Sequence, residues 1–124
     1  MLSQDARLLK SMQGRLSWIY KMKKIIAITT TETKKQAEEL AKGIIQAKLG
    51  ACVQINEIES YYHWKGKLEN SKEFRLIIKT TEEKYKEIEE FIIKNSQYDL
   101  PEIIAVNIEQ GYNKYLIWIE EETQ

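Results

Sequence analysis

The stretch SYYHWKGKLE, residues 60–69, decides the fold of this chain, because it has the pattern of a long β-hairpin's tip. Its Lys65-Gly66 pair joins two extended segments, Ala51–Trp64 and Lys67–Thr80. A two-residue connection that contains glycine favours a tight antiparallel turn. At about 3.3 Å per residue each arm could extend roughly 40 Å, far beyond the usual strand of about five or six residues. With this turn, Trp64 pairs with Lys67, and in every cross-strand pair the two residue numbers add up to 131.

The segments before the hairpin predict a buried strand and a helix. The run KIIAITT, Lys24–Thr30, is apolar and β-branched. Thr33 and Gln36 then have the spacing of a capping box, which predicts a helix start. Apolar residues follow the 3.6-residue period from there. Gly50 is expected to end this helix in a left-handed cap.

The segments after the hairpin complete a repeating order. A second helix is predicted from Thr81 to about Asn95, and a buried strand over Glu102–Ile108. The tail after Gly111 fits a strand or a helix equally well. The order strand, helix, strand, strand, helix, strand (βαββαβ) is the split βαβ pattern of an α+β, ferredoxin-like domain, with an antiparallel sheet and two helices on one face.

Composition excludes several classes of protein. The 124 residues fit one domain, and 19 Lys plus Arg balance 19 Asp plus Glu, so no global field attracts nucleic acid or an anionic membrane. The segment KEFRLIIK does not match the signature of RNA-recognition modules, which share this fold. No window approaches the roughly 18 apolar residues of a membrane span. We therefore expect no nucleic-acid and no membrane partner.

The N-terminus and the single cysteine bear on processing and location. Residues 1–21 differ in pattern from the rest and predict an N-terminal extension or leader, with an amphipathic helix as the alternative; residues 22–124 form the expected domain. No signal peptide is recognisable. Cys52 has no partner for an intrachain disulfide, which favours a soluble protein in a reducing, cytoplasmic setting.

The hairpin has little of the chemistry of a metal or catalytic site. Cys52 and the sole histidine, His63, are eleven positions apart, so they point to opposite faces of an unbulged strand and lie about 36 Å apart. They cannot share one ion within a chain. A site between subunits, or a weak site of His63 with nearby carboxylates, stays open. No nucleophile motif, P-loop or dinucleotide motif occurs.

The remaining use of such long arms is an interface. Arms longer than their own domain would leave unpaired edges and aromatic side chains exposed unless another chain covers them. We therefore expect a homo-oligomer.

Five segments in order resemble one family: ITTT, AKGIIQAKLGACVQI, ESYYHWKGKLENSKEFRLIIKT, YDLPEIIAVNI and YLIWI. Together they are similar to the CutA family of divalent cation tolerance proteins, over about Lys23–Glu120. The resemblance implies a homotrimer similar in architecture to the PII signalling proteins, with clefts between subunits. It also implies a link to copper and other divalent cations, with no established enzymatic activity.

The resemblance also indicates candidate site residues. The pattern of the family's cleft matches Tyr62, Trp64, Lys67, Glu69, Lys79, Tyr98, Pro101 and Glu102. In copper-binding members a cysteine and two histidines are ligands, and the matching positions here are Thr29, Asn95 and Ser96. Hydroxyl and carboxamide groups are poor copper ligands. We expect no cofactor other than copper or another divalent cation.

Three functions follow from these observations. The first is a trimeric protein of divalent-cation tolerance that binds or signals and is not an enzyme. The second is an enzyme site in the cleft, with Glu69 or Glu102 as acid or base and Lys67 or Lys79 as anion anchor. The third is a small-anion or nucleotide sensor, which rests on the fold alone. The hairpin aromatics would either line a ligand cleft or only pack the trimer.

Overall fold

The computed structural model describes residues 22–124, so the predicted extension over residues 1–21 lies outside the described part. The elements, in chain order, are β1 (Lys24–Thr31), α2 (Lys34–Gln46), β2 (Cys52–Trp64), β3 (Lys67–Thr81), the 3-10 turn η1 (Glu82–Lys84), α3 (Tyr85–Asn95), β4 (Ile103–Asn107) and α4 (Asn113–Glu122). None of the helices in the described part is long and apolar enough to cross a membrane.

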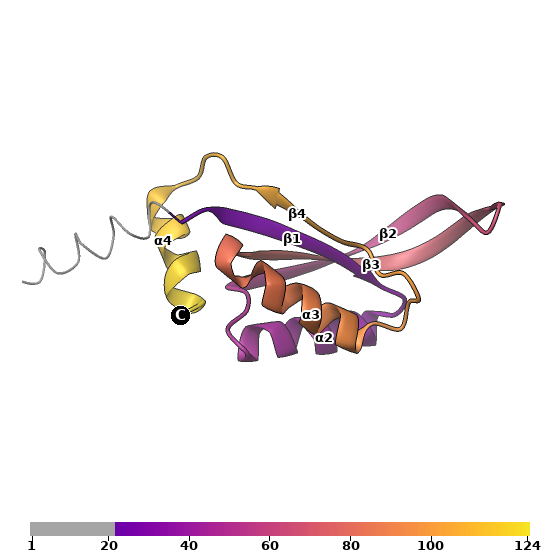
Figure 1. Ribbon diagram of the computed structural model, residues 1–124, viewed down its shortest axis with the longest axis horizontal. Helices are drawn as coiled ribbons and strands as arrows, with labels where there is room; N and C mark the ends of the chain where they lie inside the picture. Colours follow the sequence, from indigo (N-terminus) through magenta and orange to yellow (C-terminus); the bar gives the residue numbers. More distant parts are fainter. Residues whose placement is uncertain (1–21) are drawn as a thin grey trace, which may run out of the picture.

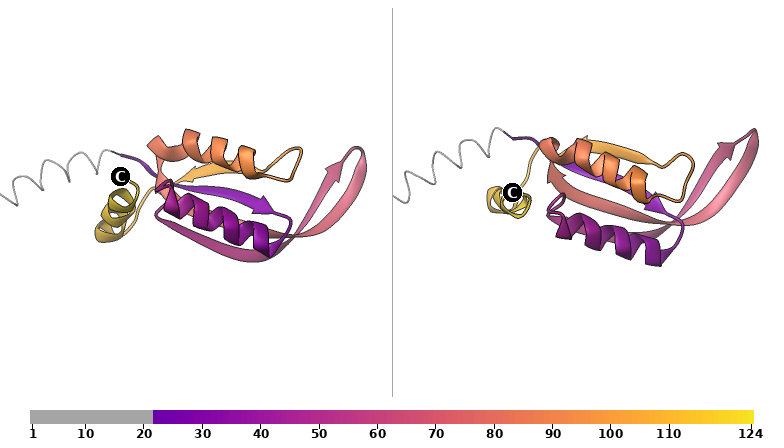
Figure 2. Two further views of the ribbon diagram at one scale, coloured as in Figure 1. Left: turned by 90° about the horizontal axis from the view of Figure 1, so that it is seen from below. Right: turned by 60° about the horizontal axis from the view of Figure 1, so that its bottom comes forward.

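The four strands form one antiparallel sheet in the order β2-β3-β1-β4. Strand β3 lies between β2 and β1, and β1 lies between β3 and β4, as in the split βαβ arrangement. Helices α2 and α3 lie side by side on one face of this sheet (Figures 1 and 2). The predicted α+β, ferredoxin-like fold is therefore confirmed.

The hydrophobic core lies between the sheet and these two helices. Alternate residues of β1 and β3, among them Ala27, Leu76 and Ile78, face Ile44 of α2 and Ile88 of α3. All five are fully buried. Burial of each large aliphatic side chain contributes about 1.5–3 kcal/mol. This layer holds the two helices against the sheet.

The other face of the sheet is not covered by α2 or α3, and we call it the open face. The strand registers place five apolar side chains on it: Ile26, Ile28, Ile77, Ile104 and Val106. Ile104 and Val106 remain 49% and 48% exposed. Apolar side chains grouped on a sheet face indicate a contact surface.

The hairpin of β2 and β3 extends well past the end of the sheet (Figure 1). Its pairs run without a bulge from Cys52 with Lys79 to Trp64 with Lys67, so the predicted register is confirmed along the whole length. Lys65 and Gly66 have φ values of 52° and 79°. Positive φ at both central residues defines a type I′ turn, whose twist suits an antiparallel hairpin.

The start of α2 follows the prediction, but its end does not. The backbone N–H of Gln36 donates to Thr33 Oγ1 (3.2 Å), and that of Thr33 donates to Gln36 Oε1 (3.1 Å), which completes the capping box. The prediction of a left-handed cap at Gly50 was wrong. The left-handed residue is Lys48, with φ of 58°.

A Schellman motif explains this helix end. The N–H groups of Lys48 and Leu49 donate to the carbonyls of Ile45 and Ile44, both at 3.0 Å. Gly50 is needed for a different reason. A Cβ atom there would lie 2.8 Å from a methyl group of Ile78, so the chain passes too close to the core for a side chain.

The C-terminal half contains one further difference and one element that the sequence had left open. The second helix begins with the 3-10 turn Glu82–Lys84 and ends at Asn95, where the sequence predicted its end. The tail after Gly111 forms the helix α4, at the end of the sheet opposite the hairpin tip (Figure 1). There the Nζ of Lys79 lies 5.5 Å from the ring centre of Tyr115. This cation–π contact joins α4 to β3.

Candidate functional site

A cavity of about 460 Å³ lies beneath the hairpin, and we call it the hairpin cavity. Three parts of the chain line it: the end of β1, the hairpin, and the loop between α3 and β4. The lining residues are Thr30, Tyr62, His63, Trp64, Glu73, Gln97, Tyr98, Asp99, Leu100 and Glu102. Its size lies in the range of roughly 300–1,000 Å³ that small-molecule sites occupy.

A hydrogen bond between Tyr98 and Glu73 ties the α3–β4 loop to the hairpin. The Tyr98 hydroxyl donates to Glu73 Oε2 at 2.8 Å, and Glu73 is only 9% exposed. The loop itself is shaped by Ser96, whose Oγ accepts from the Tyr98 backbone N–H at 3.1 Å. Burial and the bond to Glu73 raise the pKa of Tyr98 well above its usual range. The Tyr98 hydroxyl therefore stays protonated at neutral pH and acts as a hydrogen-bond donor.

Four of the eight predicted cleft residues meet in this cavity, namely Tyr62, Trp64, Tyr98 and Glu102. The other four do not line it. Lys67 and Glu69 are the strand partners of Trp64 and Tyr62, and Pro101 precedes Glu102. Lys79 lies at the opposite end of the hairpin, beneath Tyr115 of α4.

Sequence reasoning left several residues of the cavity out of the predicted cleft, above all Glu73 and Asp99. Glu73 pairs with Ile58, so by strand alternation it shares a face with Tyr62 and Trp64. The predicted register could therefore have found it. Asp99 directly follows Tyr98, but only the path of the loop decides that it also lines the cavity.

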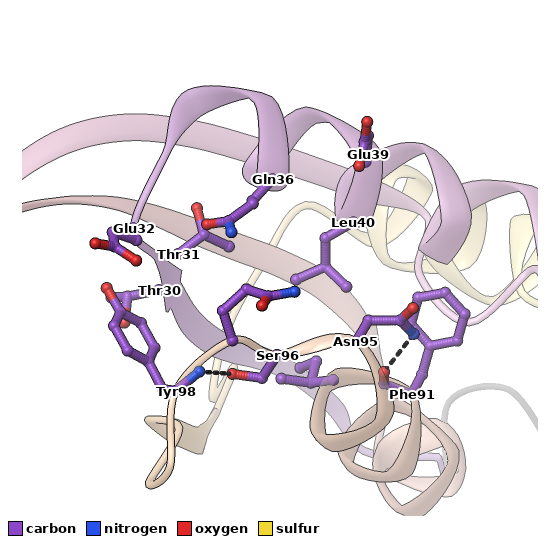
Figure 3. A pocket seen from close by; sticks show the side chains of 12 residues that line it. Thr30, Thr31, Glu32, Gln36, Glu39, Leu40, Phe91, Asn95, Ser96 and Tyr98 are labelled. Atoms are coloured by element: carbon purple, nitrogen blue, oxygen red, sulfur yellow. Dashed lines mark hydrogen bonds between the residues drawn. The ribbon is translucent and has the colours of Figure 1, made fainter.

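A second, smaller cavity of about 220 Å³ lies between the start of α2 and the end of α3 (Figure 3). Two residues at the family's copper positions line it, and both side chains already have backbone partners. Asn95 Nδ2 donates to the Phe91 carbonyl at 2.7 Å, and Ser96 Oγ accepts from Tyr98. The first bond lies in the last turn of α3, and the second lies at the start of the α3–β4 loop.

The donors at the copper positions do not fit copper. Thr29 offers a fully buried hydroxyl with no hydrogen-bond partner among the described residues, and it does not line the smaller cavity. Within residues 22–124, no group of three His, Cys, Asp or Glu side chains is close enough to hold a metal ion. Copper prefers imidazole or thiolate donors over hydroxyl and carboxamide.

Cys52 and His63 also stay apart. Both lie on β2, whose pairing with β3 keeps one register without a bulge, so their side chains leave on opposite faces of the strand. Cys52 is half-buried at the base of the hairpin, and His63 is exposed at its tip. One ion could be shared only between chains.

Comparison with known proteins identifies the family. The described residues form a ferredoxin-like α+β domain, and the family model of the CutA1 divalent ion tolerance protein matches residues 25–122. The chain belongs to this family.

Among its relatives, the divalent-cation tolerance protein CutA of Archaeoglobus fulgidus is 39% identical over 92 residues, which cover 74% of this chain and 90% of the relative. The chloroplastic protein CutA of Arabidopsis thaliana is 40% identical over 101 residues, which cover 81% of this chain but 56% of the relative. The chain thus spans little more than half of that plant protein. Its fold matches the crystal structure of CutA1 from Oryza sativa with a TM-score of 0.80 at 41% identity, covering 82% of this chain and 94% of that one.

Proposed function

We propose that this chain acts as a homotrimer in divalent-cation tolerance, by binding or signalling and not by catalysis. The observation that carries the proposal is the hairpin, which projects past the sheet with exposed aromatic side chains. Tyr61, Tyr62 and Trp64 at its tip are 68%, 43% and 38% exposed. The relative from Archaeoglobus fulgidus is named a divalent-cation tolerance protein, and the family model a divalent ion tolerance protein, which supports the biological role.

The open face supports assembly as well. Ile104 and Val106 lie on an edge strand, and β2 forms the other edge of the sheet. A sheet with two free edges and an apolar face gains stability when copies of the chain cover these surfaces. Three copies is the number that the architecture of the family implies.

Sedimentation equilibrium at micromolar concentration tests the assembly. We expect a mass of three chains that does not depend on concentration in this range. A single-chain mass would contradict the proposal, because the hairpin and the open face would then remain exposed.

Metal binding needs a different ligand set from the family's copper positions. His63 and Cys52 are the side chains with suitable donors, and each would have to act with groups of another subunit. We therefore expect copper or zinc binding only in the assembled protein.

Calorimetric titration of the metal-free protein with copper and zinc checks this, beside the variants His63→Ala and Cys52→Ala. The heat of binding should disappear in at least one of them. Copper binding that survives in the double variant would place the ligands elsewhere.

The enzyme alternative receives less support from one chain. Glu102 lines the hairpin cavity, but Glu69, Lys67 and Lys79, the other residues of that hypothesis, do not. The acid or base would therefore lack its anion anchor unless another subunit supplied one.

A cytoplasmic location is also part of the proposal, because an unpaired cysteine suits a reducing compartment. The names of two relatives give other locations: one is called chloroplastic and the other periplasmic. Cell fractionation with an antibody against this chain is the test, and recovery outside the cytoplasmic fraction would contradict it.

A further inference from the structure

We propose that the hairpin cavity binds an aliphatic polyamine, held by the carboxyl groups of its lining and by the rings of Tyr62, Trp64 and Tyr98. This ligand class goes beyond the proposed function. The lining residues belong to one chain, and Tyr62, Trp64 and Glu73 lie on the open face, so in the proposed trimer the cavity would lie beside a second chain.

The charges of the lining select a cation. Among the described residues that line the cavity, Glu73, Asp99 and Glu102 are acidic, and His63 is present, but none is a lysine or an arginine. Two cations of the hairpin have other partners: Lys72 forms an ion pair with Glu57 at 3.9 Å, and Arg75 Nε donates to Asn56 at 3.3 Å. Lys65 and Lys67 lie at the turn beside Trp64 but do not line the cavity. Like charges repel a phosphate or nucleotide from such a surface. The charges of this cavity therefore disfavour a sensor of small anions.

Glu73 is the strongest single determinant. Its carboxyl group is buried, accepts one hydrogen bond from Tyr98, and forms no salt bridge within the described part of the chain. A buried carboxylate is stabilised when a cation pairs with it, because charge-assisted hydrogen bonds are stronger than neutral ones. An ammonium group in the cavity would be such a partner.

The aromatic rings explain why the cation should be organic. Tyr62 and Trp64 are half-exposed and line the same cavity as Tyr98. Rings of this kind attract ammonium groups through their faces and also bury methylene groups. Leu100 adds a further apolar side chain to the lining. A chain of methylene groups that ends in ammonium groups matches both properties.

The spread of the acidic groups distinguishes a polyamine from a metal ion. Within residues 22–124, no three His, Cys, Asp or Glu side chains lie close enough together to hold a metal. A compact divalent ion could therefore reach only part of this set, since it needs several ligands within about 2.6 Å. A polyamine carries its charges several bonds apart and can meet separate carboxyl groups at once.

The test is calorimetric titration of the full chain with spermidine, with zinc and ATP as comparison ligands. We expect spermidine to bind once per chain and more weakly as salt rises. Glu73→Gln and Glu102→Gln should each weaken binding about tenfold, the loss expected when one charge-assisted contact is removed. Glu57→Gln is the matched control, because Glu57 is on the hairpin but does not line the cavity, and its affinity should be unchanged.

Three results would overturn the inference: no heat with millimolar spermidine, unchanged affinity in both cavity variants, or tighter binding of ATP than of spermidine. Circular dichroism checks that the variants fold; Glu102 is exposed on the loop, so its variant remains informative if Glu73→Gln unfolds. Sedimentation of the same samples separates the two proposals. A monomer that binds spermidine contradicts only the trimer, and a trimer that does not bind it contradicts only the polyamine site.

Discussion

Lys48 has a backbone conformation that is unfavourable for a residue with a side chain. It adopts φ of 58° at the end of α2, a left-handed conformation that costs L-residues about 1–2 kcal/mol but costs glycine little. Lys48→Gly should therefore raise the free energy of unfolding by about 0.5–1 kcal/mol, after the greater entropy of glycine in the unfolded chain is subtracted. Urea denaturation measures the change. Lys48→Ala is the control and should give no such gain; a destabilised glycine variant would contradict the explanation.

Tyr98 is the residue that fixes the loop over the hairpin cavity. In Tyr98→Phe, Glu73 loses its hydrogen-bond donor while it stays buried, so the free energy of unfolding should fall by about 1–3 kcal/mol. Tyr85→Phe is the matched control, because Tyr85 donates to Glu89 at 2.7 Å within one helix, where water can replace the bond. Tyr85→Phe should therefore lower the free energy of unfolding by less than Tyr98→Phe does. Equal losses in urea denaturation would argue against a special role for the Tyr98 bond.

The pKa of Tyr98 also predicts a pH dependence. Burial and Glu73 raise this pKa in the folded state, so above about pH 10 the unfolded chain releases a proton that the folded chain keeps. The stability that depends on this proton is complete below about pH 10 and is lost as pH rises above it. The difference in unfolding free energy between the wild type and Tyr98→Phe should thus shrink from about pH 8 to about pH 11. A constant difference would contradict the assignment.

Single residues were also where sequence reasoning was weakest. Glycine is the usual residue at a left-handed helix end, so the sequence predicts the left-handed residue at Gly50, whereas the structure has it at Lys48. The structure shows that glycine is required at position 50 by packing, since Ile44 and Ile78 leave no room for a Cβ atom. Local rules cannot distinguish these two uses of glycine, because the second depends on contacts distant in sequence.

At the scale of elements, local chemistry was a better guide. The turn at Lys65 and Gly66 sets the register of the entire hairpin, because strand pairing repeats from the turn without a bulge. The tail after Gly111 could not be decided from sequence, because its apolar run is short enough to fit either period. The cavity was predicted in part: the family resemblance indicated Tyr62, Trp64, Tyr98 and Glu102. The path of the α3–β4 loop, which brings Asp99 into the lining, follows from tertiary packing.

The capping box of α2 offers a test at this scale. Thr33→Ala removes the acceptor for the Gln36 backbone N–H, so the protein should lose about 1 kcal/mol of unfolding free energy. Thr33→Ser keeps an equivalent oxygen and is the matched control. Thermal denaturation compares the two. If both variants unfold at the same temperature, the box does not stabilise the helix in this protein.

At the scale of the whole molecule, the open face can be tested against a surface of similar exposure. Ile104 on this face is 49% exposed, and Ile93 on α3 is 56% exposed. If copies of the chain cover the open face, Ile104→Glu buries a charge at an interface and should dissociate the oligomer. Ile93→Glu should leave the mass unchanged. Sedimentation that gave the same mass for both variants and the wild type would place the interface elsewhere.

The unbroken pairing of β2 with β3 sets a rule for changes in the length of the hairpin. In every pair from Cys52–Lys79 to Trp64–Lys67, the two partners are the same number of residues away from the turn. Deleting a single residue from one arm would turn each side chain beyond it to the opposite face, or would have to be absorbed as a bulge. Tyr62 and Trp64 would then leave the cavity. Relatives that keep these rings in place are therefore expected to gain or lose hairpin residues by two in each arm.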